Sequence, residues 1–256
     1  MGIPLPYGIN RPMLVFALDT ATLQGTYGWV RMEENAPKAE VDAYASLKAP
    51  ATPGHAETVL ARMKTVLSYG GYALDDIDLL VFGQGPGTFT GVRIGLATIK
   101  GVALSCGTPI IGISSLEALA LSTEQSGLVA SLIDARRKEL FAALYEVRIG
   151  DDGWPLATPI LNEWVAPAMN AIERIASEVG ASTVTVTGNG IGPYKAAVKD
   201  ALNASVMPES TWAPCPFWMS RIGHMRFTFK GPDDLATSEP VYLREPDARL
   251  PAKKLK

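Results

Sequence analysis

The chain has few cysteines and histidines and no strong excess of charge. Its 256 residues include two cysteines and two histidines, and the formal net charge is −3. Cys106 and Cys215 lie far apart and outside any Cys-x-x-Cys pair, so we expect reduced thiols and a cytoplasmic protein rather than a disulfide scaffold. Without a positive excess, a broad basic face for sequence-independent nucleic-acid binding is not expected.

Long apolar runs are also missing. No stretch approaches about 18 uninterrupted apolar residues, so we expect no membrane-spanning segment and no membrane partner. Residues 1–12 contain two glycines and three prolines instead of an apolar core, which is not typical of a secretory signal. Apolar residues make up 47% of the chain, enough for one large domain or two small ones.

Apolar periodicity in the first half predicts a mixed sheet with helices on its faces. Short apolar or alternating runs predict strands, and apolar residues at helical spacing predict helices between the later ones. The expected order is three strands in a meander, then helix, strand, helix, strand, helix. The predicted strands are 13–22, 25–33, 39–47, 77–85 and 109–114, and the helices follow residues 52, 91 and 114.

The second half repeats this order in outline. A strand (127–135), a tight turn and a return strand (139–147) are followed by helix, strand, glycine turn and helix, with a last helix within 221–231. We therefore predict a structural duplication: two RNase H-like, actin/sugar-kinase-like α/β subdomains over 13–125 and 126–246. Residues 1–12 and 247–256 are expected to be flexible termini.

A glycine-rich loop follows the predicted strand 77–85 and precedes a helix. Backbone N–H groups at such a helix start can bind an anion. However, the loop lacks the Gly-Lys-Ser/Thr of the Walker pattern and the Rossmann glycine spacing. Phosphate binding and tight packing of the helix both stay open. The residues of this candidate phosphate loop, with the turn described next, are Asp19, Thr20, Gly85, Gly87, Thr88, Thr90 and Arg93.

The turn Asp19-Thr20-Ala21-Thr22 resembles the Asp-x-Gly-Thr phosphate turn of actin-like ATPases and sugar kinases. Ala21 stands where that turn has glycine, and its Cβ would crowd a phosphate. Asp19 could hold a water or a metal, or it could cap the turn through its side chain. The Gly188-Asn-Gly190 turn either faces adenosine, as in that superfamily, or is a plain turn.

Residues with catalytic potential are sparse and scattered. His55 lacks a second ligand at helical spacing, so no metal site is predicted. Asp134-Ala-Arg-Arg fits either anion recognition or a local salt bridge. No Ser-His-Asp or Cys-His set and no Gly-x-Ser-x-Gly elbow is present, so no catalytic residue is assigned.

Several motifs in order resemble one family. They are FALDTAT, HAE, GPGTFTGVRIGLATIKGVAL, GISSLEALA, DARRKELFAALYE and PVYLR, which together span residues 16–244. With them the chain resembles the TsaB (YeaZ) family of tRNA threonylcarbamoyladenosine biosynthesis. The leader before Met13, the stretch 221–231 and the C-terminal tail lie outside that pattern.

The resemblance implies an accessory role. It implies a non-catalytic partner of the TsaD paralogue in threonylcarbamoyl transfer to the adenosine following the anticodon of tRNAs reading ANN codons. It also implies that the TsaE ATPase joins the complex, that tRNA is the substrate of the complex, and that the chain self-pairs through the surface that binds TsaD. ATP and metal are expected in the partner subunits and no cofactor in this chain.

The first two helices of the N-terminal half are the predicted partner surface. The second is apolar or small nearly all round, which is typical of a helix buried on two sides, one of them a partner's helices or this chain's own. The predicted contact residues are His55, Leu60, Met63, Leu67, Val92, Gly95, Leu96 and Ile99. Two other functions stay open: an ATP-dependent kinase or ATPase of the actin/sugar-kinase superfamily, and a peptidase.

Overall fold

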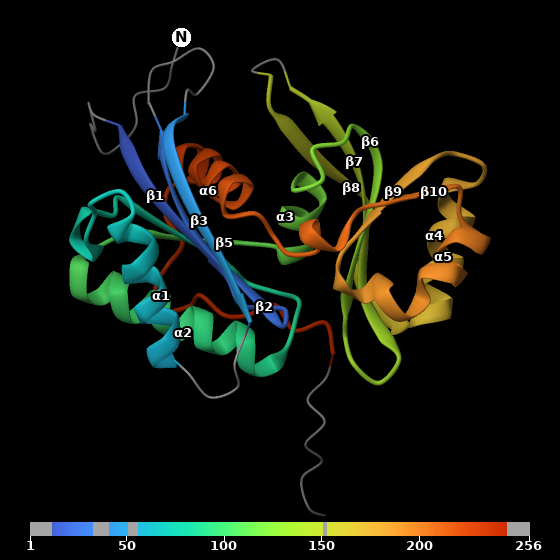
Figure 1. The fold of residues 1–256 in the computed structure, drawn as a ribbon, viewed down its shortest axis with the longest axis horizontal. Coiled ribbons are helices and arrows are strands. Elements are labelled where there is room, and N and C mark those ends of the chain that lie inside the picture. Colours follow the sequence, from blue (N-terminus) through green and yellow to red (C-terminus); the bar gives the residue numbers. More distant parts are fainter. Residues whose placement is uncertain (1–11, 33–40, 51–55, 151–152, 245–256) are drawn as a thin grey trace, which may run out of the picture.

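Two helix-flanked sheets lie side by side in the computed structural model, which describes residues 12–32, 41–50, 56–150 and 153–244 (Figure 1). Each sheet has five strands. The predicted class, an α/β fold of two subdomains with a mixed sheet in each, is confirmed.

The first sheet has the order β3-β2-β1-β4-β5. The three strands of the meander pair antiparallel, and the next two strands lie parallel to the first strand of the chain. This is the order of elements that the apolar periodicity predicted. The strands are β1 (Met13–Asp19), β2 (Gln24–Met32), β3 (Val41–Pro50), β4 (Leu79–Gly83) and β5 (Ile110–Ile113).

Helices cover both faces of this sheet. On one face, α1 (Ala56–Ser68) and α2 (Phe89–Cys106) pack against alternate side chains of β1 such as Phe16. On the other face lies α6 (Pro216–Lys230), against Val15 and its neighbours. Because β1 is buried on both faces, its sequence is a continuous apolar run rather than an alternating one. The remaining elements of this half are η1 (Leu74–Asp76) and α3 (Ser115–Leu121).

The second sheet repeats the topology of the first. Its order is β10-β9-β6-β7-β8, with an antiparallel meander β6-β7-β8 and the last two strands parallel to β6. The inferred duplication is therefore visible in the strand order. The elements are β6 (Gly127–Asp134), β7 (Glu139–Ile149), β8 (Pro155–Pro167), α4 (Ala168–Val179), β9 (Val184–Thr187), η2 (Asn189–Tyr194), α5 (Lys195–Ala201), β10 (Ala204–Val206) and η3 (Glu209–Thr211).

Both edge strands of the second sheet were absent from the sequence prediction. β8 is exposed or half-buried along nearly all its length and contains three prolines, at positions 155, 159 and 167, so it shows neither an apolar run nor clean alternation. Proline is tolerated there because an edge strand has N–H groups that need no partner strand. β10 is three residues long, too short for a periodic pattern.

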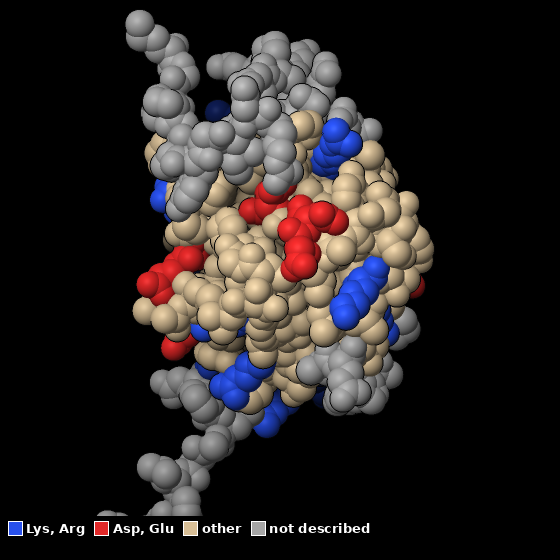
Figure 2. Space-filling model, turned by 90° about the vertical axis from the view of Figure 1, so that its left-hand side faces the viewer, with Lys and Arg blue, Asp and Glu red and all other residues tan. Residues whose placement is uncertain are grey.

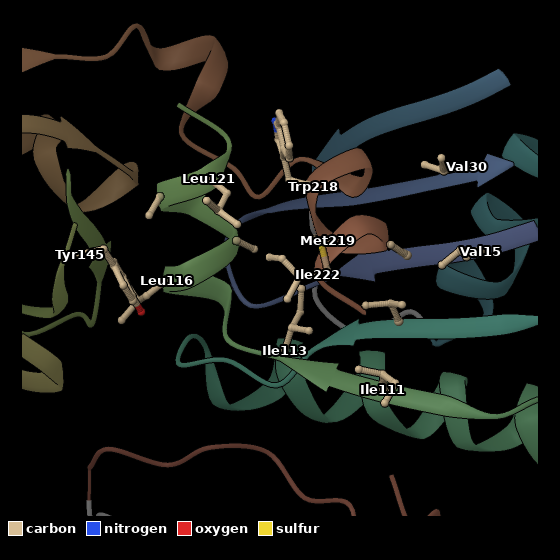
Figure 3. Close-up of a cluster of buried hydrophobic side chains, with 14 of the residues drawn as sticks. Val15, Val30, Ile111, Ile113, Leu116, Leu121, Tyr145, Trp218, Met219 and Ile222 are labelled. Carbon is tan, nitrogen blue, oxygen red and sulfur yellow. The ribbon is translucent and has the colours of Figure 1, made fainter. Parts of the chain in front are cut away.

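The helix predicted within 221–231 begins earlier, at Pro216, and lies in another place than expected. Although α6 follows the second sheet in the chain, it packs on the first sheet, against β1, β2, β4 and β5. The assignment of residues 126–246 to the second subdomain is therefore wrong for α6. Figure 3 shows the reason: Met219 and Ile222 point towards the first sheet, in one buried cluster with Val15, Ile111 and Trp218, where burial removes their apolar surface from water.

The same apolar cluster joins the two subdomains. Leu116 and Leu121 of α3 and Tyr145 of β7 belong to it together with the side chains of α6 (Figure 3). α3 contacts β6, β7 and β8 of the second sheet. The subdomains thus share one hydrophobic core at this junction.

One described helix, α2, has the length and hydropathy of a membrane-crossing helix. Its residues Leu96 and Ile99 are buried against the first sheet, and Arg93 and Lys100 lie within it. We therefore treat α2 as a core helix of this fold.

Close packing of α6 on the first sheet can be tested with glycine substitutions. A Cβ at Gly223 would lie 2.3 Å from Val81 Cγ2, whereas a Cβ at Gly101 of α2 would have nothing within 4 Å. We expect Gly223→Ala to lower the free energy of unfolding by about 1–3 kcal/mol through overpacking. Gly101→Ala should raise it by about 0.5–1 kcal/mol through helix propensity.

Denaturant unfolding of both variants measures these changes. Equal effects of the two substitutions would contradict the packing of α6 described above.

Candidate functional site

The Asp-Thr turn after β1 faces inward. Asp19 is completely buried; its Oδ1 accepts the N–H of Ala21 at 2.8 Å, and its Oδ2 accepts the hydroxyl of Ser115. A Cβ on Gly83 would lie 1.9 Å from Asp19 Oδ2. The carboxylate therefore joins the ends of β1 and β4 to the start of α3. Of the two interpretations of Asp19, the structure matches the capping one.

The glycine loop packs directly on this turn. The N–H of Thr88 donates to the carbonyl of Ala21 at 2.7 Å, and the hydroxyl of Thr20 donates to the carbonyl of Gly91 at 2.8 Å. A Cβ on Gly87 would lie 2.3 Å from Ala21 O, and one on Gly91 would lie 2.1 Å from Thr20 O. The glycines thus give the turn room to approach α2, and the turn itself fills the space between them.

The predicted partner-binding residues are mostly core residues. Met63, Leu67 and Ile99 are fully buried, and Leu96 nearly so, in the cluster between the helices and the first sheet, and Val92 is buried outside that cluster. A Cβ on Gly95 would lie 2.3 Å from Thr20 Oγ1. Their prediction as surface contacts is wrong, because the apolar stripe of each helix faces the chain's own sheet. Leu60 is half-buried against that core, and His55 lies outside the described residues.

A cavity of about 680 Å³ lies next to the glycine loop, between the two subdomains. Four predicted residues line it, whereas Asp19, Thr20 and Gly85 do not. From the first subdomain come Gly87, Thr88, Phe89, Thr90 and Arg93; from the second, residues 134–137 and Phe141; and from the segment after α6, residues 241–244.

Arg93 is held in this cavity by aromatic groups. Its guanidinium carbon lies 3.6 Å from the ring centroid of Phe89, and its Nε donates to the hydroxyl of Tyr242 at 2.6 Å. Both rings are about half exposed. Because these partners are neutral, the charge of Arg93 stays available to an anion. Arg93 was predicted from the sequence as a candidate phosphate-loop residue, whereas no sequence motif indicated a role for Phe89 or Tyr242.

The opposite wall is an unusual turn between β6 and β7. Arg136, Arg137 and Lys138 all have left-handed backbone conformations, with φ of 65°, 53° and 62°. Each such residue costs about 1–2 kcal/mol relative to a right-handed one. The turn is held by the N–H of Arg136, which donates to Asp134 Oδ1 at 2.8 Å, and by an ion pair between the same side chains at 3.3 Å. The predicted local salt bridge is therefore present.

A polar cluster at the junction of the subdomains was missed by the sequence analysis. The hydroxyls of Ser114 and Tyr145 both donate to Glu163 Oε1, and Glu117 forms an ion pair with Arg226 at 2.6 Å. Burial raises the pKa of both glutamates, and these contacts partly offset the rise. The side chains come from the start of α3 and from β7, β8 and α6, which are distant in sequence, so no local motif reveals them.

No metal centre emerges within the described ranges, because no group of three or more His, Cys, Asp or Glu side chains there could hold an ion. His224 lies in α6, where burial lowers its pKa to about 4. Its Nε2 is buried and has no hydrogen-bond partner among the described residues. This histidine is therefore neutral near pH 7.

The fold and the cleft define a structural class of protein. Two sheets of one topology that enclose a cleft are typical of duplicated RNase H-like α/β proteins. The profile of the family described as "TsaD: tRNA N6-adenosine threonylcarbamoyltransferase" matches residues 49–201, more than half of the chain. The chain belongs to this family, in its TsaB (YeaZ) branch.

Several relatives support the branch. Proteins named "tRNA threonylcarbamoyladenosine biosynthesis protein TsaB" are 28% identical over 196 residues in Haemophilus influenzae and 33% over 139 residues in Bacillus subtilis. The alignments cover 74% and 54% of this chain and 80% and 57% of those proteins. The Escherichia coli TsaB is 39% identical over 95 residues, 36% of this chain and 41% of its own.

A solved structure supports the fold. YeaZ from Pseudomonas aeruginosa superposes with a TM-score of 0.70 at 24% identity and covers 90% of this chain and 100% of its own. At this identity the likeness establishes the architecture alone.

The buried carboxyl of Asp19 should make stability depend on pH. Burial raises its pKa above the ordinary 3.8, more than the bonds from Ser115 and Ala21 lower it. The stabilisation that Asp19 contributes is therefore full below its unfolded pKa and is lost as pH rises through the folded pKa. Relative to Asp19→Asn, the wild type should lose about 1.4 kcal/mol per pH unit between those two values.

Urea unfolding of both proteins between about pH 3.5 and 8 measures this difference, because that range runs from the ordinary carboxyl pKa to above neutrality. A difference independent of pH would show that Asp19 is not desolvated.

The left-handed turn can be tested through its backbone. Lys138→Gly should raise the free energy of unfolding by about 0.5–1 kcal/mol, since glycine adopts a positive φ without strain but is more mobile when unfolded. Lys138→Ala removes the same charge and keeps a Cβ, so it is the matched control and should be nearly neutral. Equal stabilities of the two variants, measured by thermal or urea unfolding, would contradict a strained turn.

Proposed function

We propose that this chain is a non-catalytic partner of a TsaD-type subunit in tRNA threonylcarbamoyladenosine biosynthesis. Membership of the TsaB branch supports involvement in that process. In the proposed complex, the partner transfers threonylcarbamoyl to the adenosine following the anticodon of tRNAs reading ANN codons. This chain binds and activates that partner, in the cytoplasm, and the TsaE ATPase joins the pair.

One observation carries the accessory role. The turn 19–22 packs into the glycine loop, so the place where a kinase of this superfamily would hold phosphate is filled by Ala21 and Thr20. Asp19, the residue that such an enzyme would aim at the phosphates, is turned towards Ser115. This arrangement favours a scaffold over an ATP-dependent kinase.

The peptidase alternative lacks support for a similar reason. His224, the histidine that the structure describes, is buried in α6 with a pKa of about 4. Ser114 and Ser115 donate to carboxylates and have no histidine partner within the described ranges. A nucleophile–base pair of the kind that peptidases need is therefore not supported.

The outer ridge of α2 is the surface that we propose for the partner. Beyond the cleft residues Phe89 and Arg93, its exposed residues recur at helical spacing: the small Ala97 and Gly101, and then the large apolar Leu104. Small residues let a second helix approach closely, and Leu104, 75% exposed, offers apolar surface to bury.

The surrounding surface fits a protein partner. Figure 2 looks onto the side of the molecule where α1 and α2 lie in Figure 1, and most of that surface is neither basic nor acidic. Acidic side chains gather near the centre of this view, and the surface around them carries few charges, as is typical of the central part of a protein–protein contact. The same ridge is the proposed site of self-pairing, in which two copies would bring their α2 helices together.

Ala97→Glu tests this assignment. A carboxylate buried between helices without a partner group is unfavourable, so the affinity for the TsaD paralogue should fall at least about tenfold. Ala196→Glu, an equivalent change on the exposed side of α5, is the matched control and should leave the affinity unchanged. Isothermal titration calorimetry measures the affinities, and circular dichroism checks folding.

A wild-type chain that forms no complex with the paralogue would overturn the proposed function. Equal affinities of the Ala97→Glu variant and the wild type would instead move the interface away from α2.

A further inference from the structure

A second cavity continues the cleft along the second subdomain. It has a volume of about 530 Å³ and shares Asp134, Arg136 and Arg137 with the cavity of about 680 Å³. Lys138 and Tyr194 belong to the second cavity alone. The left-handed turn thus forms a common wall of both, with Arg136 and Arg137 bordering both cavities and Lys138 bordering the second.

Positive charge exceeds negative charge along the lining of these two cavities, which we call the cationic track. Arg136 is paired with Asp134, and Arg244 with Glu139. Arg93 contacts neutral aromatic groups, and Lys138 forms no ion pair within the described ranges. With Arg93 and Lys138 outside any ion pair of the described residues, the cavities have an anion-attracting lining on a chain whose net charge is −3.

Flat rings lie beside these charges. Phe89 and Tyr242 are exposed, border the first cavity and lie 5.7 Å apart, centroid to centroid, and the half-buried Tyr194 borders the second. Exposed rings next to cations are the two features by which proteins bind unpaired nucleotides, through stacking of the base and neutralisation of the phosphate. An anion without a ring would use only one of them.

The spread of the charges favours a strand over a free nucleoside triphosphate. The phosphates of a nucleoside triphosphate lie close together, and proteins usually bind them at one glycine loop that precedes a helix. In this chain that point is closed by the contact of Ala21 with Gly87 and Thr88. The cations lie instead along two adjoining cavities, as successive phosphates of a strand would require.

We infer that the cleft between the subdomains binds a single-stranded segment of RNA, with phosphates along Arg136, Arg137 and Lys138 and bases on the exposed rings. This inference rests on the proposed function, since the RNA would be the tRNA on which the complex acts. The chain would then contact the substrate itself, in addition to binding the transferase subunit through α2.

The strained backbone of the turn fits this role. Three successive left-handed residues are unfavourable unless the surroundings hold them, and such strain is concentrated at functional sites. Here the conformation is fixed by the N–H of Ala168, which donates to Lys138 O at 2.9 Å, and by the N–H of Glu139, which donates to Arg136 O at 2.9 Å. The backbone that carries Arg136, Arg137 and Lys138 is thereby fixed before a ligand binds.

The test compares two double variants of equal charge. Arg136→Ala/Arg137→Ala removes two cations from the track, and Arg148→Ala/Lys199→Ala removes two exposed cations elsewhere on the second subdomain. Fluorescence anisotropy measures binding of a labelled, unmodified tRNA transcript that reads an ANN codon, by the full chain in complex with the TsaD paralogue. A labelled ATP analogue is titrated against the isolated chain in parallel.

We expect the track variant to bind the transcript about tenfold or more weakly, with a shallower salt dependence, and the control variant to bind it nearly like the wild type. Both variants should form the complex with the paralogue normally. Equal loss in the two variants would assign the effect to net charge and overturn the inference. So would unchanged RNA binding by the track variant in an intact complex, which leaves the proposed function standing.

The inference would also be overturned if the track variant alone lost binding of the ATP analogue while its RNA binding stayed unchanged. That outcome would assign the cleft to a free nucleotide. Failure of the wild type to bind the paralogue rejects the proposed function instead. In that case the isolated chain and its variants still decide the RNA inference, through the same anisotropy titration.

Discussion

The contact between the Asp-Thr turn and the glycine loop determines the arrangement of this molecule. Asp19 is anchored by Ser115, so the backbone of Thr20 and Ala21 projects towards α2. Glycines at 87 and 91 let that backbone approach to distances that a Cβ would forbid. The start of α2 is thereby fixed, and with it the direction of the outer ridge and the position of Phe89 and Arg93 at the cleft.

The same contact closes one corner of the cleft between the two duplicated subdomains, because Thr20 and Ala21 fill the space beside the glycine loop. What remains open is the side of the cleft formed by the second subdomain, where the residues are cationic and the backbone is strained. The cleft is thus closed at one corner and lined by cationic residues on the opposite wall.

Long-range packing makes the two halves one unit. α6 leaves the second half of the chain and covers the first sheet, and α3 lies between the sheets. Val241 then donates its N–H to Gln84 O at 2.8 Å, and Arg244 pairs with Glu139. The segment after α6 thus links the glycine loop to the second subdomain and borders the cleft with Tyr242.

The sequence alone determined the order of elements and the family, because buried strands such as β1 are continuous apolar runs and the motifs from FALDTAT to DARRKELFAALYE are local. It left out β8 and β10, since an exposed edge strand with three prolines and a strand of three residues have no periodic signal. Only the tertiary structure decided which side of α2 meets the sheet, because glycine and alanine surround that helix and periodicity cannot rank them. It also decided how the glycine loop packs, through the contact of Ala21 with Thr88, and which residues line the cleft, such as Arg93 and Tyr242. These residues are far apart in sequence, so their contacts arise only when the chain is folded.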